Sequence, residues 1–114
     1  MLKDLAHFTG SETWYRHGLV PKVTFTEGAK YVADQAGAYW LLDEIALAQQ
    51  FEPRIAAELF QVWQLIVTGT TAQLSVEDGD GREVHAKRIP VTDFPEPGIT
   101  LWFTDSVILL PSEY

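Results

Sequence analysis

The chain has 114 residues, a length that suits one domain and is too short for two hydrophobic cores. Hydrophobic residues make up 46% and charged residues 21%, which is the composition of a folded globular protein and excludes bulk disorder. Sixteen Asp and Glu residues against eight Lys and Arg give a formal net charge of −8, the wrong sign for a general nucleic-acid-binding protein.

Cysteine is absent from the sequence, which excludes disulfides, thiolate zinc sites and cysteine nucleophiles. No window approaches the roughly 18 apolar residues of a membrane helix, and the first ten residues lack the apolar segment of a signal peptide. We therefore expect residues 1–114 to form a single cytoplasmic domain without a membrane segment.

The first quarter of the sequence is predicted to form only short helices and a short strand. Apolar residues at helical spacing over residues 2–8 predict a short helix, and a further helical turn is expected over residues 13–17, ended by Gly18. Pro21 then precedes an alternating stretch at residues 23–26, which predicts an edge strand because proline removes a ladder donor.

Two longer helices are expected next. Thr26 can cap a helix over residues 27–36, whose apolar residues lie on one face, and Gly37 is placed to end it. A second helix is predicted over residues 38–50. Its inward stripe is formed by residues at helical spacing, namely Ala38, Leu41, Ile45 and Ala48.

The apolar period changes to two after residue 58, which predicts strands. The expected strands cover residues 59–67, 72–76, 82–89, 99–104 and 107–110. Asp-Gly pairs at residues 78–81 predict a hairpin turn. In the strand after this turn, Val84 and Ala86 are expected to point inward, with His85 on the polar face. Six residues are predicted to be buried in the core: Leu41, Ile45, Val62, Leu74, Leu101 and Phe103.

These elements predict an α+β fold, in which N-terminal helices pack on one face of a C-terminal antiparallel sheet of about four strands.

Common catalytic and metal-binding motifs are missing. The three histidines, His7, His17 and His85, show none of the spacings of zinc ligands, and the 77–81 segment lacks the third and twelfth ligands of an EF-hand loop. No serine stands in a nucleophile motif, and no glycine-rich phosphate loop is present. We expect no metal and no cofactor, and no conventional enzyme is supported.

One candidate site combines the segment around His17 with the acidic pair Asp43 and Glu44. Arg16 or His17 is predicted to contact Asp43 or Glu44, because Glu44 lies at the boundary of the inward helical stripe. The set has two interpretations: an ion pair that fastens the N-terminal segment to the second helix, or a pocket with an acid, a base and aromatic walls. Its members are Trp14, Tyr15, Arg16, His17, Tyr39, Trp40, Asp43 and Glu44.

The second candidate site is an acidic surface. Between residues 35 and 81 the only Lys or Arg is Arg54, so this part of the chain is strongly acidic. Such a surface attracts basic proteins and repels nucleic acid. Its proposed members are Asp43, Glu52, Glu58, Glu77, Asp78 and Asp80. The alternative is that these charges only keep the protein soluble.

Four segments of the sequence resemble a family of small bacterial proteins of unknown function whose members are commonly found with plasmids, phages and other mobile elements. These segments, with x for any residue, are FTGSExWYRH at 8–17, GAYWLLDEIA at 37–46, TDFP at 92–95 and LLPSEY at 109–114. The resemblance implies a bacterial cytoplasmic setting and a role in mobile-element biology. It implies no catalytic residue.

Two classes of function follow. The first is a non-enzymatic module that binds a basic protein surface, in one form an inhibitor that mimics DNA charge and acts on a host nucleic-acid-handling defence system. The second is a small-molecule binder or unorthodox enzyme with a pocket around Arg16, His17, Asp43 and Glu44. A pocket that encloses these four residues would favour the second class, and a convex acidic face would favour the first.

Overall fold

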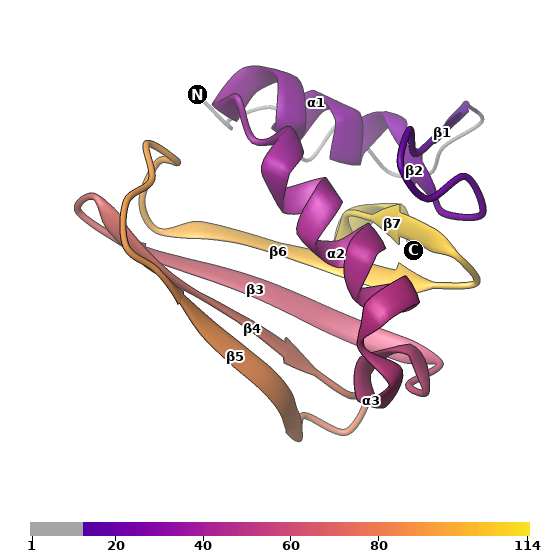
Figure 1. The fold of residues 1–114 in the computed structure, drawn as a ribbon. Coiled ribbons are helices and arrows are strands. Elements are labelled where there is room, and N and C mark those ends of the chain that lie inside the picture. Colours follow the sequence, from indigo (N-terminus) through magenta and orange to yellow (C-terminus); the bar gives the residue numbers. More distant parts are fainter. Residues whose placement is uncertain (1–12) are drawn as a thin grey trace.

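The computed structural model describes residues 13–114, which form a seven-stranded sheet with helices on one of its faces (Figure 1). The elements in chain order are β1 (Trp14–Arg16), β2 (Thr24–Thr26), α1 (Glu27–Ala36), α2 (Tyr39–Phe51), α3 (Pro53–Ala56), β3 (Phe60–Thr68), β4 (Thr71–Glu77), β5 (Glu83–Ile89), β6 (Gly98–Thr104), β7 (Val107–Leu109) and the 3₁₀ helix η2 (Pro111–Glu113). The predicted helix over residues 2–8, together with His7, lies outside the described residues.

The strand order is β1-β2-β7-β6-β3-β4-β5. Neighbouring strands are antiparallel except for β2 and β7, which are parallel. The α+β class is therefore confirmed. The prediction of about four antiparallel strands behind N-terminal helices is wrong, since the sheet is larger and mixed and two of its strands precede α1.

The first two strands explain this difference. Residues 14–16 were expected to form a helical turn, but they pair with β2, and Tyr15 stacks on Phe25 with ring centroids 5.7 Å apart. Aromatic residues suit a pleated surface, and pairing across the sheet outweighs weak local helix signals. β2 is also not an edge strand, because it lies between β1 and β7. Pro21 precedes the strand and leaves its ladder intact.

The two longer helices follow the sequence pattern closely. α1 has the predicted bounds, with the Thr26 hydroxyl accepting from the Ala29 amide at 3.2 Å and Gly37 ending the helix at φ 61°. α2 begins and ends one residue later than expected. All four residues of its predicted inward stripe are buried.

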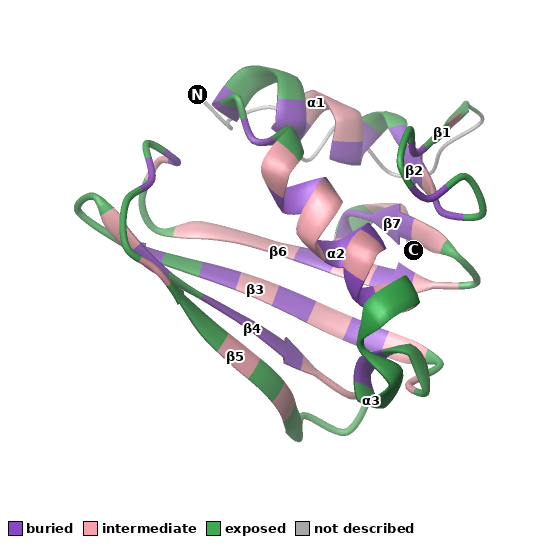
Figure 2. Ribbon diagram, viewed as in Figure 1, coloured by how far each residue is buried: buried purple, intermediate pink, exposed green. Residues whose placement is uncertain are grey.

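Most of the core lies between α1, α2 and the covered face of the sheet (Figure 2). Five of the six predicted core residues are buried, and Val62 is only half-buried. In β3 the side chains alternate, so Trp63 and Leu65 face the helices and Val62 faces the other side. On that side the ring of Tyr114, which follows η2, packs on Phe60 and Trp102, with ring centroids 5.6 and 5.5 Å apart. The longer helices α1 and α2 lie on the opposite face, so Val62 remains only half-buried.

The predicted faces of β5 also need correction. Its register pairs His85 with Val76 and Lys87 with Leu74, both of which are core residues. His85 and Lys87 therefore lie on the helix-covered side, and Ala86 lies on the opposite face beside Ser75. A register irregularity beside Glu77 accommodates Val84, which is half-buried against the core. A shift of one residue in the pairing moves every side chain of a strand to the opposite face of the sheet. The residue types of β5 alone do not determine its register with β4.

Candidate functional site

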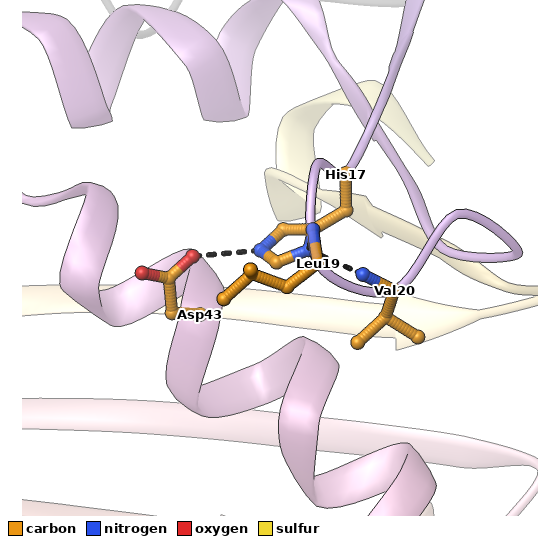
Figure 3. Close-up of polar contacts among 4 residues, drawn as sticks. All are labelled: His17, Leu19, Val20 and Asp43. Atoms are coloured by element: carbon orange, nitrogen blue, oxygen red, sulfur yellow. Dashed lines mark hydrogen bonds and ion pairs between the residues drawn. The ribbon is translucent and has the colours of Figure 1, made fainter.

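His17 connects the loop after β1 to helix α2 (Figure 3). Its side chain is 5% exposed, and its Nε2 atom lies 2.7 Å from Oδ1 of Asp43, a residue of α2. On the other side of the ring, Nδ1 accepts the backbone N–H groups of Leu19 and Val20, both at 3.1 Å. The predicted contact between the two segments is therefore present, as a histidine–aspartate hydrogen bond.

The hydrogen bonds assign the ring proton of His17. Two amide donors point at Nδ1, so Nδ1 is the acceptor and Nε2 carries the hydrogen that is donated to Asp43. Both ring nitrogens are then engaged within the protein. In this arrangement His17 has no free nitrogen with which to take a proton from a substrate, so the pair fastens the loop to α2.

The other members of the first candidate set do not join this pair. Arg16 directly precedes His17 in an extended segment, so its exposed side chain points to the uncovered face of the sheet. Glu44 instead reaches β5, where its carboxylate lies 2.8 Å from Nζ of Lys87. Arg16, His17, Asp43 and Glu44 therefore do not enclose one pocket.

The aromatic members of that set are also dispersed. Trp14 is exposed on the uncovered side of β1, and Trp40 is half-buried against the core. Tyr15 lies on the covered side, where Nζ of Lys30 is 5.5 Å from its ring centroid. The Tyr39 hydroxyl donates to Asp34 of α1.

Asp34 is the centre of a small exposed network on α1. Its carboxylate accepts from Lys30 at 2.7 Å and from the Tyr39 hydroxyl. These two hydrogen bonds, that from Lys30 first, lower the pKa of Asp34. The same contacts raise the pKa of Lys30 and of Tyr39, chiefly through their hydrogen bonds to Asp34. The network supports the α1–α2 junction.

Five of the six acidic candidates gather at one end of the molecule, near α3 and the β4–β5 turn (Figure 1). A Cβ atom on Gly79 in this turn would lie 3.7 Å from the Phe60 side chain, which places the turn beside the start of β3. We call this region the acidic end; its carboxylates are Glu52, Glu58, Glu77, Asp78 and Asp80. Asp43 lies apart from it, on the side of α2 that faces His17.

Asp78 organises the β4–β5 turn. Its Oδ1 accepts the amides of Asp80 at 2.8 Å and Arg82 at 2.9 Å. The hydrogen bond from the Arg82 amide is the main reason that the pKa of Asp78 is lowered, with that from Asp80 adding to it. This carboxylate is therefore a fixed negative charge and also a structural part of the turn.

Two polar residues with central structural roles were missed by sequence reasoning. Gln61 is fully buried, accepts from the Trp63 indole at 3.0 Å, exchanges hydrogen bonds with Gln49 and donates to the Ile55 carbonyl. A glutamine within an apolar strand pattern was the available signal. The second residue is Glu113, near the C-terminal end of the sequence.

Glu113 binds the beginning of α1. Its carboxylate accepts from the Thr26 hydroxyl at 2.6 Å and from the Gly28 and Leu110 amides at 3.1 and 2.8 Å. A Cβ atom on Gly28 would lie 2.7 Å from the Glu113 carboxyl carbon, so glycine permits the close approach. A negative charge at a helix N-terminus is favourable, and here it joins segments 85 residues apart in sequence.

Among residues 13–114, no group of three or more His, Asp or Glu side chains is arranged to hold a metal ion. No helix in the described part of the chain is long and apolar enough to span a membrane.

The fold and these contacts define a small α+β protein with one helix-covered sheet face and an acidic end. The chain belongs to a family of unknown function, DUF6876, whose model matches residues 1–114. No curated protein and no solved structure matches the chain.

Proposed function

We propose that this protein is a non-enzymatic binding module whose acidic end binds a basic surface on another protein. The observation that carries this proposal is the clustering of five carboxylates, distant in sequence, around α3 and the β4–β5 turn. Arg54 of α3 and Arg82 after the turn are the basic residues of this region, so its net charge is negative. The net charge of −8 for the whole chain acts in the same direction.

Exposed apolar side chains accompany these charges. Phe51, at the end of α2, is 65% exposed, and Leu59, immediately before β3, is 89% exposed. Figure 2 shows the end of α2 and α3 as mostly exposed. Protein interfaces commonly combine a few large apolar contacts with a charged rim, so the acidic end offers both contact area and electrostatic attraction.

The setting we propose is the bacterial cytoplasm and the biology of plasmids or phages, which the sequence motifs suggest. In that setting, a basic protein surface that normally holds nucleic acid is a suitable target. A protein that carries negative charge can occupy such a surface without binding DNA itself, since like charges repel. Inhibition of a host defence system that handles nucleic acid is the specific form of this proposal.

The experiment compares two charge reversals of equal size. A partner is first isolated by affinity purification from a bacterial host and identified by mass spectrometry, and its association rate is then measured at several salt concentrations. Asp80→Lys changes the acidic end, whereas Asp93→Lys changes an exposed residue that follows β5, on a different part of the surface. We expect a rate that falls as salt rises, and a roughly threefold or greater loss for Asp80→Lys alone.

Three results would contradict the proposal. The first is an association rate that does not depend on salt, and the second is an equal loss for the Asp80 and Asp93 variants. The third is tight binding of duplex DNA in a gel-shift assay at about 0.15 M salt, where like charges should prevent it.

A further inference from the structure

A small cleft opens between the helices and the β4–β5 side of the sheet. It has a volume of about 160 Å³. Its apolar floor and walls are Leu47, Ala48, Phe51, Ile55, Trp63, Leu74 and Val76, and its polar rim is Glu44, Glu52, His85 and Lys87. The cleft opens at β5, the edge strand of the sheet, whose helix-side residues His85 and Lys87 are exposed, whereas Leu74 and Val76 of β4 are buried at its bottom.

The floor of the cleft is fixed by the buried Gln61 network. Trp63 is 4% exposed, and its indole N–H is held by Gln61, which in turn contacts Gln49 of α2 and the backbone of α3. No buried side-chain N or O atom among the described residues lacks a hydrogen-bond partner. Because these partners lock the indole in place, the floor is already formed before any ligand arrives.

The rim contains polar groups that the protein itself does not use. Lys87 is neutralised by Glu44 at 2.8 Å. Within residues 13–114, neither the Glu52 carboxylate nor the His85 ring has a hydrogen-bond or ion-pair partner. The cleft therefore presents one unpaired anion and one imidazole beside an apolar floor.

We propose that this cleft binds a small ligand that consists of one ring and a primary ammonium group. A cavity of about 150 Å³ holds one benzene ring, which sets the size of the apolar part. The ring packs on Leu47 and Phe51, the two apolar lining residues that are not buried, over the floor that contains Trp63, and the ammonium group donates to the Glu52 carboxylate and to the His85 ring. An anionic ligand is disfavoured because Lys87 is already paired and the chain as a whole carries −8. This site does not rest on the proposed binding of a basic protein.

The test uses three probes of nearly equal size and different charge: 2-phenylethylamine, 2-phenylethanol and phenylacetate. Each is titrated into the full chain, and ¹H–¹⁵N spectra are recorded, with the Trp63 indole N–H as the reporter of the floor. A ligand of this size in an open cleft is expected to bind with a dissociation constant on the order of 1 mM. We expect the amine to bind most tightly and phenylacetate most weakly.

Three variants test where the probes bind. Glu52→Gln removes the unpaired charge and should weaken the amine roughly two- to fivefold without affecting the alcohol. Glu58→Gln changes the net charge equally but lies outside the cleft lining, so it should leave both probes within about twofold. Ala48→Met fills the cleft and should abolish the shift of the Trp63 reporter.

The proposal is overturned if the Trp63 reporter does not move with the amine, if phenylacetate binds as tightly as the amine, or if the two glutamine variants act equally. If Ala48→Met does not fold, the comparison of the Glu52 and Glu58 variants decides alone, since both side chains lack partners among the described residues.

Discussion

The His17 contact gives a prediction whose size follows from the structure. His17→Ala removes the acceptor for the Leu19 and Val20 amides and the donor to Asp43. The hydrogen bond to Val20 is buried, and a buried donor left without a partner costs about 1–3 kcal/mol. The side chain of Asp43 is 44% exposed, so water can replace the lost donor there.

Two conservative variants separate the two sides of the ring. The side-chain oxygen of asparagine stands close to the position of Nδ1, whereas the end of a glutamine side chain stands close to that of Nε2. His17→Asn can therefore keep the acceptor for the loop amides, and His17→Gln can keep the contact with Asp43. We expect the acceptor for the loop amides to contribute more, because the donors it satisfies are less accessible to water.

The free energy of unfolding of each variant is measured by urea denaturation with tryptophan fluorescence. The expected losses are about 2–4 kcal/mol for His17→Ala and about 1 kcal/mol or less for Asp43→Ala, with His17→Asn recovering at least about 1 kcal/mol. A loss for Asp43→Ala as large as that for His17→Ala, or a larger recovery with glutamine than with asparagine, would contradict this assignment of the two sides of the ring.

Three further predictions concern other polar contacts. Glu113→Ala should lower the free energy of unfolding by about 1–3 kcal/mol, because it removes the acceptor for the Thr26 hydroxyl and the Gly28 amide; urea denaturation checks this, and a loss below about 0.3 kcal/mol would contradict it. Gln61→Leu should lower the free energy of unfolding by about 2–4 kcal/mol. Trp63→Phe should lower it less in the Gln61→Leu background than in the wild-type chain, because the indole has then already lost its acceptor. Equal losses in the two backgrounds of this double-mutant cycle would contradict the coupling. The carboxyl of Asp78 should titrate below the ordinary value of about 3.9 when followed by ¹³C NMR, because two amides donate to its charged form. The stabilisation that the ionised Asp78 carboxylate provides is fully present above a pH of about 3.9, and it is lost as the pH falls through the lowered pKa. A titration midpoint at or above about 3.9 would be inconsistent with two amide hydrogen bonds to this carboxylate.

The sequence predicted the elements that depend on local signals. The helix over residues 27–36 has a cap at Thr26, an apolar face and a glycine after it, and each of these acts within a few residues. The hairpin turn after β4 is likewise set by an Asp-Gly pair. Such features can be read from one short window.

The features that were missed depend on distant partners. Residues 14–16 form a strand because β2 is available to pair with them, and β2 is itself placed beside β7, more than 80 residues later in the chain. The face on which His85 lies is decided by its register with β4. For the candidate site, the sequence predicted that Arg16 or His17 contacts Asp43 or Glu44, and the structure forms the contact between His17 and Asp43. It did not predict that Arg16 would point away, which depends on a strand in place of a helical turn, or that Glu44 would pair with Lys87, which depends on the register of β5.

The motifs that resemble the family contain many residues with structural tasks. His17 and Asp43 fasten a loop to α2, Glu113 binds the start of α1, and the Thr92 hydroxyl accepts the amide of the buried Phe94. A side chain already satisfied within the protein has little capacity left for a partner. Exposed groups that make no contact within the fold are therefore the better candidates for binding a partner.

Those unused groups lie close together. Glu52 and His85 have no hydrogen-bond or ion-pair partner among residues 13–114, and Phe51, which is 65% exposed, lines the wall of the same cleft. A mostly exposed aromatic ring and a carboxylate without a partner contribute little to the stability of the folded chain. A ligand with a ring and a positive charge, or a basic protein surface, would cover the Phe51 ring and neutralise the Glu52 carboxylate. Substitutions around α3 should therefore reduce binding before they reduce the stability of the fold.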